Sequence, residues 1–152
     1  TIFGIFFKMI EGIIISKRKQ IVDDRGKIMH MLRNDDKIFT SFGEIYFSFI
    51  FKDKIKAWHL HEKMTLNYSL IHGKIKLVLY DDRDKSKTKG QIQEIILSTD
   101  EHCVITVPPL IWNGFKVIGE DYSIVANCSD IPHDPNEIKR RNFNDEYIPY
   151  RW

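Results

Sequence analysis

The sequence predicts an all-β fold, a sandwich or barrel built as one domain. Short apolar runs alternate with turn residues about every eight to twelve positions, a spacing typical of such folds. The runs are rich in Ile, Val, Phe, Tyr and Thr, which fit a pleated, half-buried surface. With 152 residues, no internal repeat and no Pro/Gly/Ser-rich linker, the chain is long enough for a single core.

Ten strands are expected, together with one short helix. The strands are Gly12–Ser16, Gly26–Arg33, Glu44–Phe51, Lys56–Leu60, Thr65–His72, Gly73–Tyr80, Gln91–Leu97, His102–Val107, Trp112–Val117 and Tyr122–Cys128. The helix is expected at Asp134–Ile138, because Asp134 is a good N-cap residue and Pro135 takes the first helical position.

The strand Glu44–Phe51 alternates between two kinds of face. One face carries Ile45, Phe47, Phe49 and Phe51, and the other carries Glu44, Tyr46, Ser48 and Ile50. A polar and aromatic face opposite an apolar one suits a barrel whose interior holds a ligand. We therefore expect Tyr46 and Ser48 to face a ligand site.

The two ends of the chain are unusually apolar. Residues 1–8 precede Met9 and are expected to be an extension or an extra edge strand, with a single domain over residues 9–152. The run Ile2–Phe7 is far shorter than the ~20 residues that span a bilayer and lacks the features of a signal peptide. We expect a cytoplasmic protein without a membrane partner. The aromatic tail Tyr147–Trp152 is expected to fold onto the barrel or onto a partner subunit.

The bulk composition is that of a folded globular protein. Hydrophobic residues make up 43% and charged residues 29% of the chain. The net charge is only +2, and the basic residues are spread along the chain, so we expect no nucleic-acid partner. Two cysteines, Cys103 and Cys128, are too few for a disulfide scaffold or a zinc cluster and are expected to be reduced.

His59 and His61 lie two residues apart on a predicted strand, so their side chains face the same side. Metal-binding cupins carry such a pair, but the positions of their other two ligands hold Leu66 and Asn113 here. Two histidines alone rarely hold a transition metal, so we expect no metal. Acid–base chemistry remains, as does the alternative of two histidines bonded only to backbone carbonyls. A basic histidine needs a carboxylate partner, which spacing alone does not identify.

The stretch Asp23–Gly26 forms a second candidate group, in a predicted turn. The planar guanidinium of Arg25 could bind a phosphate in a two-pronged fashion. The alternative is a surface turn with a local salt bridge.

From about Ile21 to Trp152 the chain resembles the dTDP-4-dehydrorhamnose 3,5-epimerase family, metal-free cupins that act on nucleotide-linked 4-keto sugars. The resemblance implies a double-stranded β-helix, the jelly-roll barrel of the cupins. Its landmarks, in order, are Asp24-Arg25-Gly26, Ser48, His59, Gly73, Tyr80-Asp81-Asp82-Arg83, Ser86-x-Thr88-x-Gly90, Val107-Pro108, Gly114-Phe115 and Ile148-x-Tyr150-x-Trp152.

The resemblance also implies roles. His59 matches the base that removes the proton beside the keto group, and Asp145 matches the carboxylate paired with it. Arg25 matches a phosphate-binding residue, and Lys56 replaces an arginine near the diphosphate and sugar. The side chains expected to bind substrate are Arg25, Lys56, Tyr46, Ser48, His61 and Asn113. A nucleotide-sugar substrate, a homodimer and no cofactor are implied.

The chain departs from the family at several positions. The family's proton-donating tyrosine falls near Ala126, its enolate-stabilising lysine near Leu66, and a later histidine at Asn113. Glu44 and Tyr46 replace the usual Gln and Asn. An epimerase therefore needs another donor, and Tyr46, Tyr68, His61 or water are the options.

Three functions follow from these residues. The leading hypothesis is an enzyme that epimerises or isomerises a nucleotide-linked 4-keto-6-deoxy sugar, for polysaccharide or natural-product synthesis. The reaction would be epimerisation at C3, C5 or both, or movement of the carbonyl between adjacent carbons. The alternatives are a sugar- or nucleotide-sugar-binding cupin without catalysis and a metal-dependent cupin enzyme.

Overall fold

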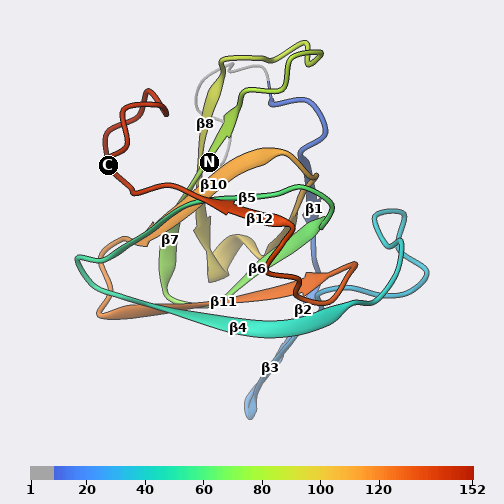
Figure 1. The fold of residues 1–152 in the computed structure, drawn as a ribbon. Helices are drawn as coiled ribbons and strands as arrows, with labels where there is room; N and C mark the ends of the chain where they lie inside the picture. The colour runs from blue at the N-terminus through green and yellow to red at the C-terminus, as the bar shows by residue number, and fades with distance from the viewer. Residues whose placement is uncertain (1–8) are drawn as a thin grey trace.

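The computed structural model describes residues 9–152, which form two five-stranded antiparallel sheets and a separate hairpin (Figure 1). The expectations for residues 1–8 lie outside the described residues. The first sheet has the order β1 (Ile14–Lys17), β9 (Cys103–Val107), β6 (Leu66–His72), β11 (Tyr122–Ser129) and β4 (Glu44–Phe51). The second has the order β12 (Ile138–Arg140), β5 (Ile55–His61), β10 (Ile111–Val117), β7 (Lys74–Asp81) and β8 (Ile92–Ser98).

Successive strands alternate between the two sheets, from β4 to β7 and again from β8 to β12. This alternation is the pattern of a jelly roll, and it confirms the predicted all-β double-stranded β-helix. The reversal from β6 to β7 takes one residue, Gly73, whose φ of +85° favours glycine. No helix among residues 9–152 is long and apolar enough to cross a membrane.

The hairpin of β2 (Gln20–Asp23) and β3 (Gly26–Met29) projects away from the two sheets beyond β4 (Figure 1). Strand β2 was not predicted, and the next strand was expected to end at Arg33. That strand stops at Met29, and the chain then turns where the backbone N–H of Arg33 donates to the Asp36 carboxylate. The other predicted strands are confirmed within two residues at each end.

The predicted helix at Asp134–Ile138 is wrong. Asp134 caps a single turn by accepting a hydrogen bond from the Asn136 N–H at 2.9 Å, and β12 begins at Ile138. The local cap signal is real, but the pairing of β12 with β5 outweighs helix formation.

The hydrophobic core fills the space between the sheets, where Leu77, Leu79, Ile105 and Val107 are fully buried. Trp58 faces the opposite side of its sheet and packs in a second cluster with Ile148. The ring centroids of Tyr150 and Trp152 lie 6.0 and 5.2 Å from that of Trp58, which confirms that the aromatic tail folds onto the barrel. These contacts fix the outer side of β5, and therefore also the direction of His59 and His61.

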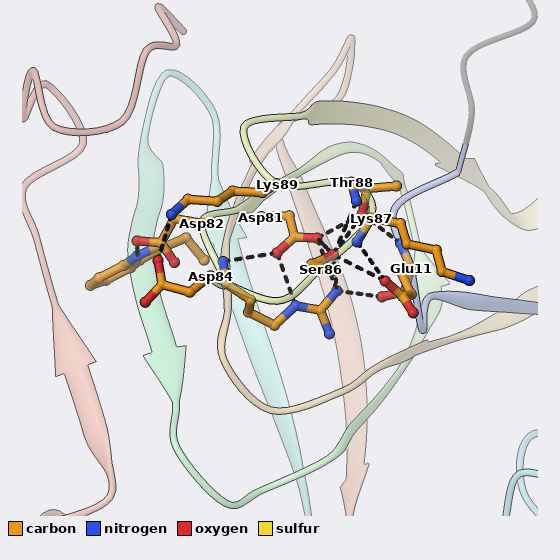
Figure 2. Close-up of polar contacts among 10 residues, drawn as sticks. Glu11, Asp81, Asp82, Asp84, Ser86, Lys87, Thr88 and Lys89 are labelled. Carbon is orange, nitrogen blue, oxygen red and sulfur yellow. Dashed lines mark hydrogen bonds and ion pairs between the residues drawn. The ribbon is translucent and has the colours of Figure 1, made fainter.

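The loop between β7 and β8 anchors the N-terminal segment (Figure 2). Asp81 is fully buried, and its carboxylate accepts hydrogen bonds from Arg83, Ser86 and Thr88. Burial would raise the pKa of Asp81, but these hydrogen bonds hold it well below its usual range. Glu11 joins the network through the N–H of Lys87 at 2.8 Å. The network therefore links the segment before β1 to the loop between β7 and β8.

Candidate active site

A cavity of ≈ 1340 Å³ opens between the two sheets. One wall comes from β4, β6 and β11, and the facing wall from β5, β10 and β12. The structure places six of the residues expected at the site along these walls: Tyr46, Ser48, Lys56, His59, His61 and Asp145. A volume of this size accommodates a ligand as large as a nucleotide sugar.

A chain of hydrogen bonds fixes the protonation of His59. Its Nε2 lies 3.0 Å from the Tyr68 hydroxyl, which lies 2.9 Å from Oδ1 of Asn113. The Asn113 amide nitrogen donates to two backbone carbonyls, so Oδ1 is an acceptor. Tyr68 gives its single proton to that oxygen and must accept from Nε2 of His59. The lone pair of the neutral imidazole is therefore on Nδ1.

The surroundings of His59 favour this neutral form. Burial, followed by the electrostatic influence of His61, Arg140 and Lys56, lowers the pKa of His59 to about 3. A proton-accepting imidazole is thus present throughout the neutral pH range. The positive charges of Arg140 and Lys56, which disfavour an imidazolium here, would stabilise an anion formed beside it.

His61 is paired with a buried carboxylate that the sequence analysis missed. Its Nδ1 is hydrogen-bonded to Oε1 of Glu137, and Oε2 accepts from the N–H groups of Lys63 and Met64 at 3.1 and 3.2 Å. Burial would raise the pKa of Glu137, but the bonds from His61 and the two N–H groups lower it. Glu137 is therefore ionised. It lies 76 residues from His61, within the segment expected to be helical, so no local signal could have revealed it.

Asp145 lines the cavity but does not bond His59. Its carboxylate accepts from Arg141 at 3.1 Å and from the N–H of Tyr147 at 2.9 Å. The expected His59–Asp145 hydrogen bond is absent, because a partner four residues away in the chain captures the carboxylate. His59 is oriented by a tyrosine hydroxyl instead of a carboxylate.

Tyr46 faces the cavity from β4 and is held by a buried amide. Its hydroxyl oxygen lies 3.0 Å from Nδ2 of Asn127. Oδ1 of Asn127 accepts the backbone N–H of Asn67 at 3.0 Å, which fixes the orientation of the amide. Asn127 therefore donates to Tyr46.

Four cations line the cavity: Lys56, Lys139, Arg140 and Arg141. Lys56 donates to Ser48 at 2.9 Å and so links β5 to β4. Arg141 is stacked between Trp112 and Tyr147, with 5.5 and 3.9 Å from its guanidinium carbon to the ring centroids. The only acidic side chains on the walls are Glu44 and Asp145 among the described residues. The basic run 139–141 is visible in the sequence, but its position beside the cavity depends on the pairing of β12 with β5.

Within residues 9–152, no group of three or more His, Cys, Asp or Glu side chains is placed to hold a metal ion. The rings of His59 and His61 lie 5.9 Å apart, and each is bound to a protein partner, Tyr68 and Glu137 respectively.

The sequence and the fold of this chain match those of known proteins. The family model for dTDP-4-dehydrorhamnose 3,5-epimerase matches residues 8–152. The chain belongs to this family. The predicted family is thereby confirmed, and with it the predicted class of enzyme, a sugar epimerase.

Similar proteins include the spore coat polysaccharide biosynthesis protein SpsL of Bacillus subtilis, which is 30% identical over 95% of this chain and 97% of the relative. The crystal structure of a dTDP sugar isomerase from Desulfovibrio desulfuricans has a TM-score of 0.91 and 40% identity, and the match covers 94% and 92% of the two chains. An epimerase from Legionella pneumophila in complex with dTDP-4-keto-L-rhamnose shares the fold, with a TM-score of 0.82 and 21% identity over 95% and 80% of the chains.

Some positions that match functional residues of the family do not line the cavity of this epimerase. Asn113 is fully buried and does not line the cavity; it contacts the Tyr68 hydroxyl through Oδ1 and the His59 carbonyl through its amide nitrogen. Leu66 belongs to the hydrophobic core. Ala126 is buried on β11, between two residues that line the cavity. Arg25 does not line the cavity of its own chain; it lies in the turn of the projecting β2–β3 hairpin and forms an ion pair with Asp23 at 2.6 Å.

Proposed function

We propose that this enzyme epimerises a nucleotide-linked 4-keto-6-deoxy sugar at a carbon next to the keto group, with His59 as the base. The observation that carries the proposal is the chain His59–Tyr68–Asn113, which leaves a free lone pair on Nδ1 of a neutral imidazole in a cavity lined by cations. The reaction moves only protons and uses no cofactor.

The four cations of the cavity wall can bind the negatively charged diphosphate of such a substrate. A diphosphate carries charge along its whole length, and the arginine forks of Arg140 and Arg141 bind phosphate oxygens in pairs. Lys56, bonded to Ser48, is assigned to the junction of diphosphate and sugar. The Asp145 carboxylate accepts a hydrogen bond from the Arg141 guanidinium, so the role proposed for Asp145 is to position that cation.

Proton removal by His59 leaves an enolate beside it. An enolate forms readily only where positive charge or strong donors face its oxygen. The positive charge of Lys56 already acts on His59, and we assign it the same effect on the enolate. A bound diphosphate would in turn offset the charges that lower the pKa of His59, which makes the imidazole a stronger base in the complex than in the free enzyme.

The functional unit is proposed to be a homodimer. The outward face of β4 exposes Ile45, Phe47, Phe49 and Phe51, each between 49% and 64% accessible. A long apolar edge strand with no cover is a surface that another chain would bury. The β2–β3 hairpin projects beyond the same strand, so Arg25 is proposed to reach the phosphates in the partner's cavity (Figure 1). The cytoplasm is the proposed location, with neither nucleic acid nor a membrane as partner.

The test is solvent exchange. The enzyme is incubated with dTDP-4-keto-6-deoxyglucose in D2O, and the protons at C3 and C5 are followed by NMR. Deuterium should enter at one or both carbons, and the His59→Gln variant should lose this exchange. Binding of the nucleotide sugar without exchange would instead identify a non-catalytic sugar-binding protein. Exchange that is unchanged in His59→Gln would exclude His59 as the base.

A further inference from the structure

Epimerisation needs a second group that His59 cannot supply. Proton removal and proton return from one face restore the original configuration, so inversion requires an acid on the opposite face of the enolate. Ala126 has no proton to give, so the donor is water or another side chain, and a side chain would have to lie on the cavity wall that faces β5.

Tyr46 is on that wall. It extends from β4 in the first sheet, whereas His59 extends from β5 in the second, and both line the cavity. In the register of β4 and β11, Tyr46 lies directly opposite Asn127, next to Ala126. Tyr46 and Asn127 therefore face the same side of the first sheet, toward the cavity, whereas Ala126 pairs with Phe47, whose side chain is on the outward face.

The hydrogen bonds of Tyr46 leave its proton free. Asn127 uses Oδ1 to accept the N–H of Asn67, so its Nδ2 is the group that meets Tyr46, and the tyrosine oxygen is the acceptor. No described residue accepts the Tyr46 proton. Burial raises the pKa of Tyr46, so the hydroxyl is protonated at neutral pH. The Thr106 hydroxyl donates a hydrogen bond to Oδ1 of Asn67 at 2.8 Å and so holds the residue whose N–H orients Asn127.

The other two candidate side chains are less well placed. The Tyr68 hydroxyl donates its proton to Asn113 and accepts a hydrogen bond from His59. It therefore positions the base and has no proton free for the enolate. His61 lies on the same strand and the same side as His59, and its Nδ1 is held by Glu137. A donor there would serve the face that His59 already serves.

We propose that Tyr46 is the acid of this epimerase and that Asn127 positions it. The inference rests on the proposed function. His59 takes the proton from the carbon, and the C–H electron pair moves into the enolate. When the keto group re-forms, the enolate carbon takes the Tyr46 proton on the other face. The tyrosinate then recovers a proton from water, and His59 releases one to water, so protons and charge balance over the cycle.

The experiment compares exchange with inversion in Tyr46→Phe, using dTDP-4-keto-6-deoxyglucose in D2O. The variant should form the epimer at least about 100-fold more slowly than the wild type. It should still place deuterium at the same carbon with retained configuration, because His59 can return a solvent-derived proton to its own face. The matched control is Tyr80→Phe, whose hydroxyl makes no hydrogen bond to the described residues and lies outside the cavity wall; both rates should be unchanged.

Asn127→Asp provides a second readout. The carboxylate has nearly the same shape and can still accept the N–H of Asn67, but its other oxygen would accept the Tyr46 proton instead of leaving it free. The ratio of inversion to exchange should fall, while binding of dTDP stays close to that of the wild type.

The outcomes separate the two proposals. Inversion at the wild-type rate in Tyr46→Phe would overturn the role of Tyr46 and leave the epimerase function intact. Loss of exchange together with inversion in Tyr46→Phe would also overturn it, because an acid that acts only on the enolate is not needed for proton removal. Absence of both reactions in the wild type would overturn the proposed function itself.

Discussion

Nε2 of His59 lies 3.0 Å from the hydroxyl of Tyr68, and this bond, rather than one to a carboxylate, determines which nitrogen of the histidine is free. Tyr68 can play this part because Asn113 is fully buried and its amide has only one possible orientation. A neutral hydrogen-bond chain holds the tautomer without adding a negative charge behind the base. The base is therefore weaker than one backed by a carboxylate until an anionic substrate binds.

Tyr68→Phe should lower kcat by roughly 10²- to 10⁴-fold, because the tautomer of His59 is no longer fixed. The ¹⁵N chemical shifts of His59 report the tautomer directly: the wild type should show a protonated Nε2 and a bare Nδ1, and the variant a mixture. The loss of a partner for buried Asn113 should also cost about 1–3 kcal/mol of unfolding free energy. A wild-type spectrum with the proton on Nδ1 would contradict the hydrogen-bond chain.

The lowered pKa of His59 predicts a contribution to acid instability. The unfolded chain binds a proton at this residue below about pH 6.5, whereas the folded protein binds it only near pH 3, so folding is disfavoured as the pH falls through that window. Above about pH 6.5 both states are neutral and the effect vanishes. The free energy of unfolding, measured in urea from pH 7 to pH 4, should fall less steeply in His59→Gln than in the wild type. Parallel curves would show that the pKa of His59 is not depressed.

Glu137→Ala should destabilise the protein by about 3–5 kcal/mol, because it leaves His61 and two backbone N–H groups without their buried partner. Glu137→Gln keeps an acceptor and should cost less. The control is Glu62→Gln, which removes an exposed ion pair with Lys139 and should cost less than about 1 kcal/mol. Thermal and urea unfolding measure these differences. A similar loss in Glu62→Gln and Glu137→Ala would argue against a special role for the buried pair.

Phe49→Glu should dissociate the proposed dimer, because it places a charge on the apolar outer face of β4. Light scattering after gel filtration gives the mass directly. Ile96→Glu is the matched control, since Ile96 is also an exposed apolar residue but lies on β8 of the other sheet. A wild-type monomer would refute the proposed assembly.

Mixed dimers of His59→Gln and Arg25→Ala test whether Arg25 serves the partner's cavity. Each variant alone should be inactive or severely impaired. Mixed dimers place an intact His59 beside an intact Arg25 from the other chain in one of two sites, so an equal mixture should recover roughly a quarter of the wild-type activity. No recovery would indicate that Arg25 acts within its own chain or has no part in the reaction.

Much of this protein was determined by sequence alone. Side chains alternate along a strand with a fixed period of two, so the ligand-facing side of Glu44–Phe51 and the shared direction of His59 and His61 follow from local geometry. The buried Trp58 on the other side of β5 follows from the same rule. The turn at Asp23–Gly26 and the chain reversal at Gly73 likewise follow from local sequence, because glycine is the residue that favours a positive φ.

Partners were decided only by the tertiary structure. Asp145 has the right chemistry for His59 but bonds Arg141, four residues away, whereas Glu137 reaches His61 across 76 residues. The cations of β12 reached the cavity only because that segment pairs with β5 instead of forming a helix. Periodicity fixes which way a side chain points, because it depends on neighbouring bonds. Which group it meets depends on how the two sheets pack, and that is set by burial of the whole core.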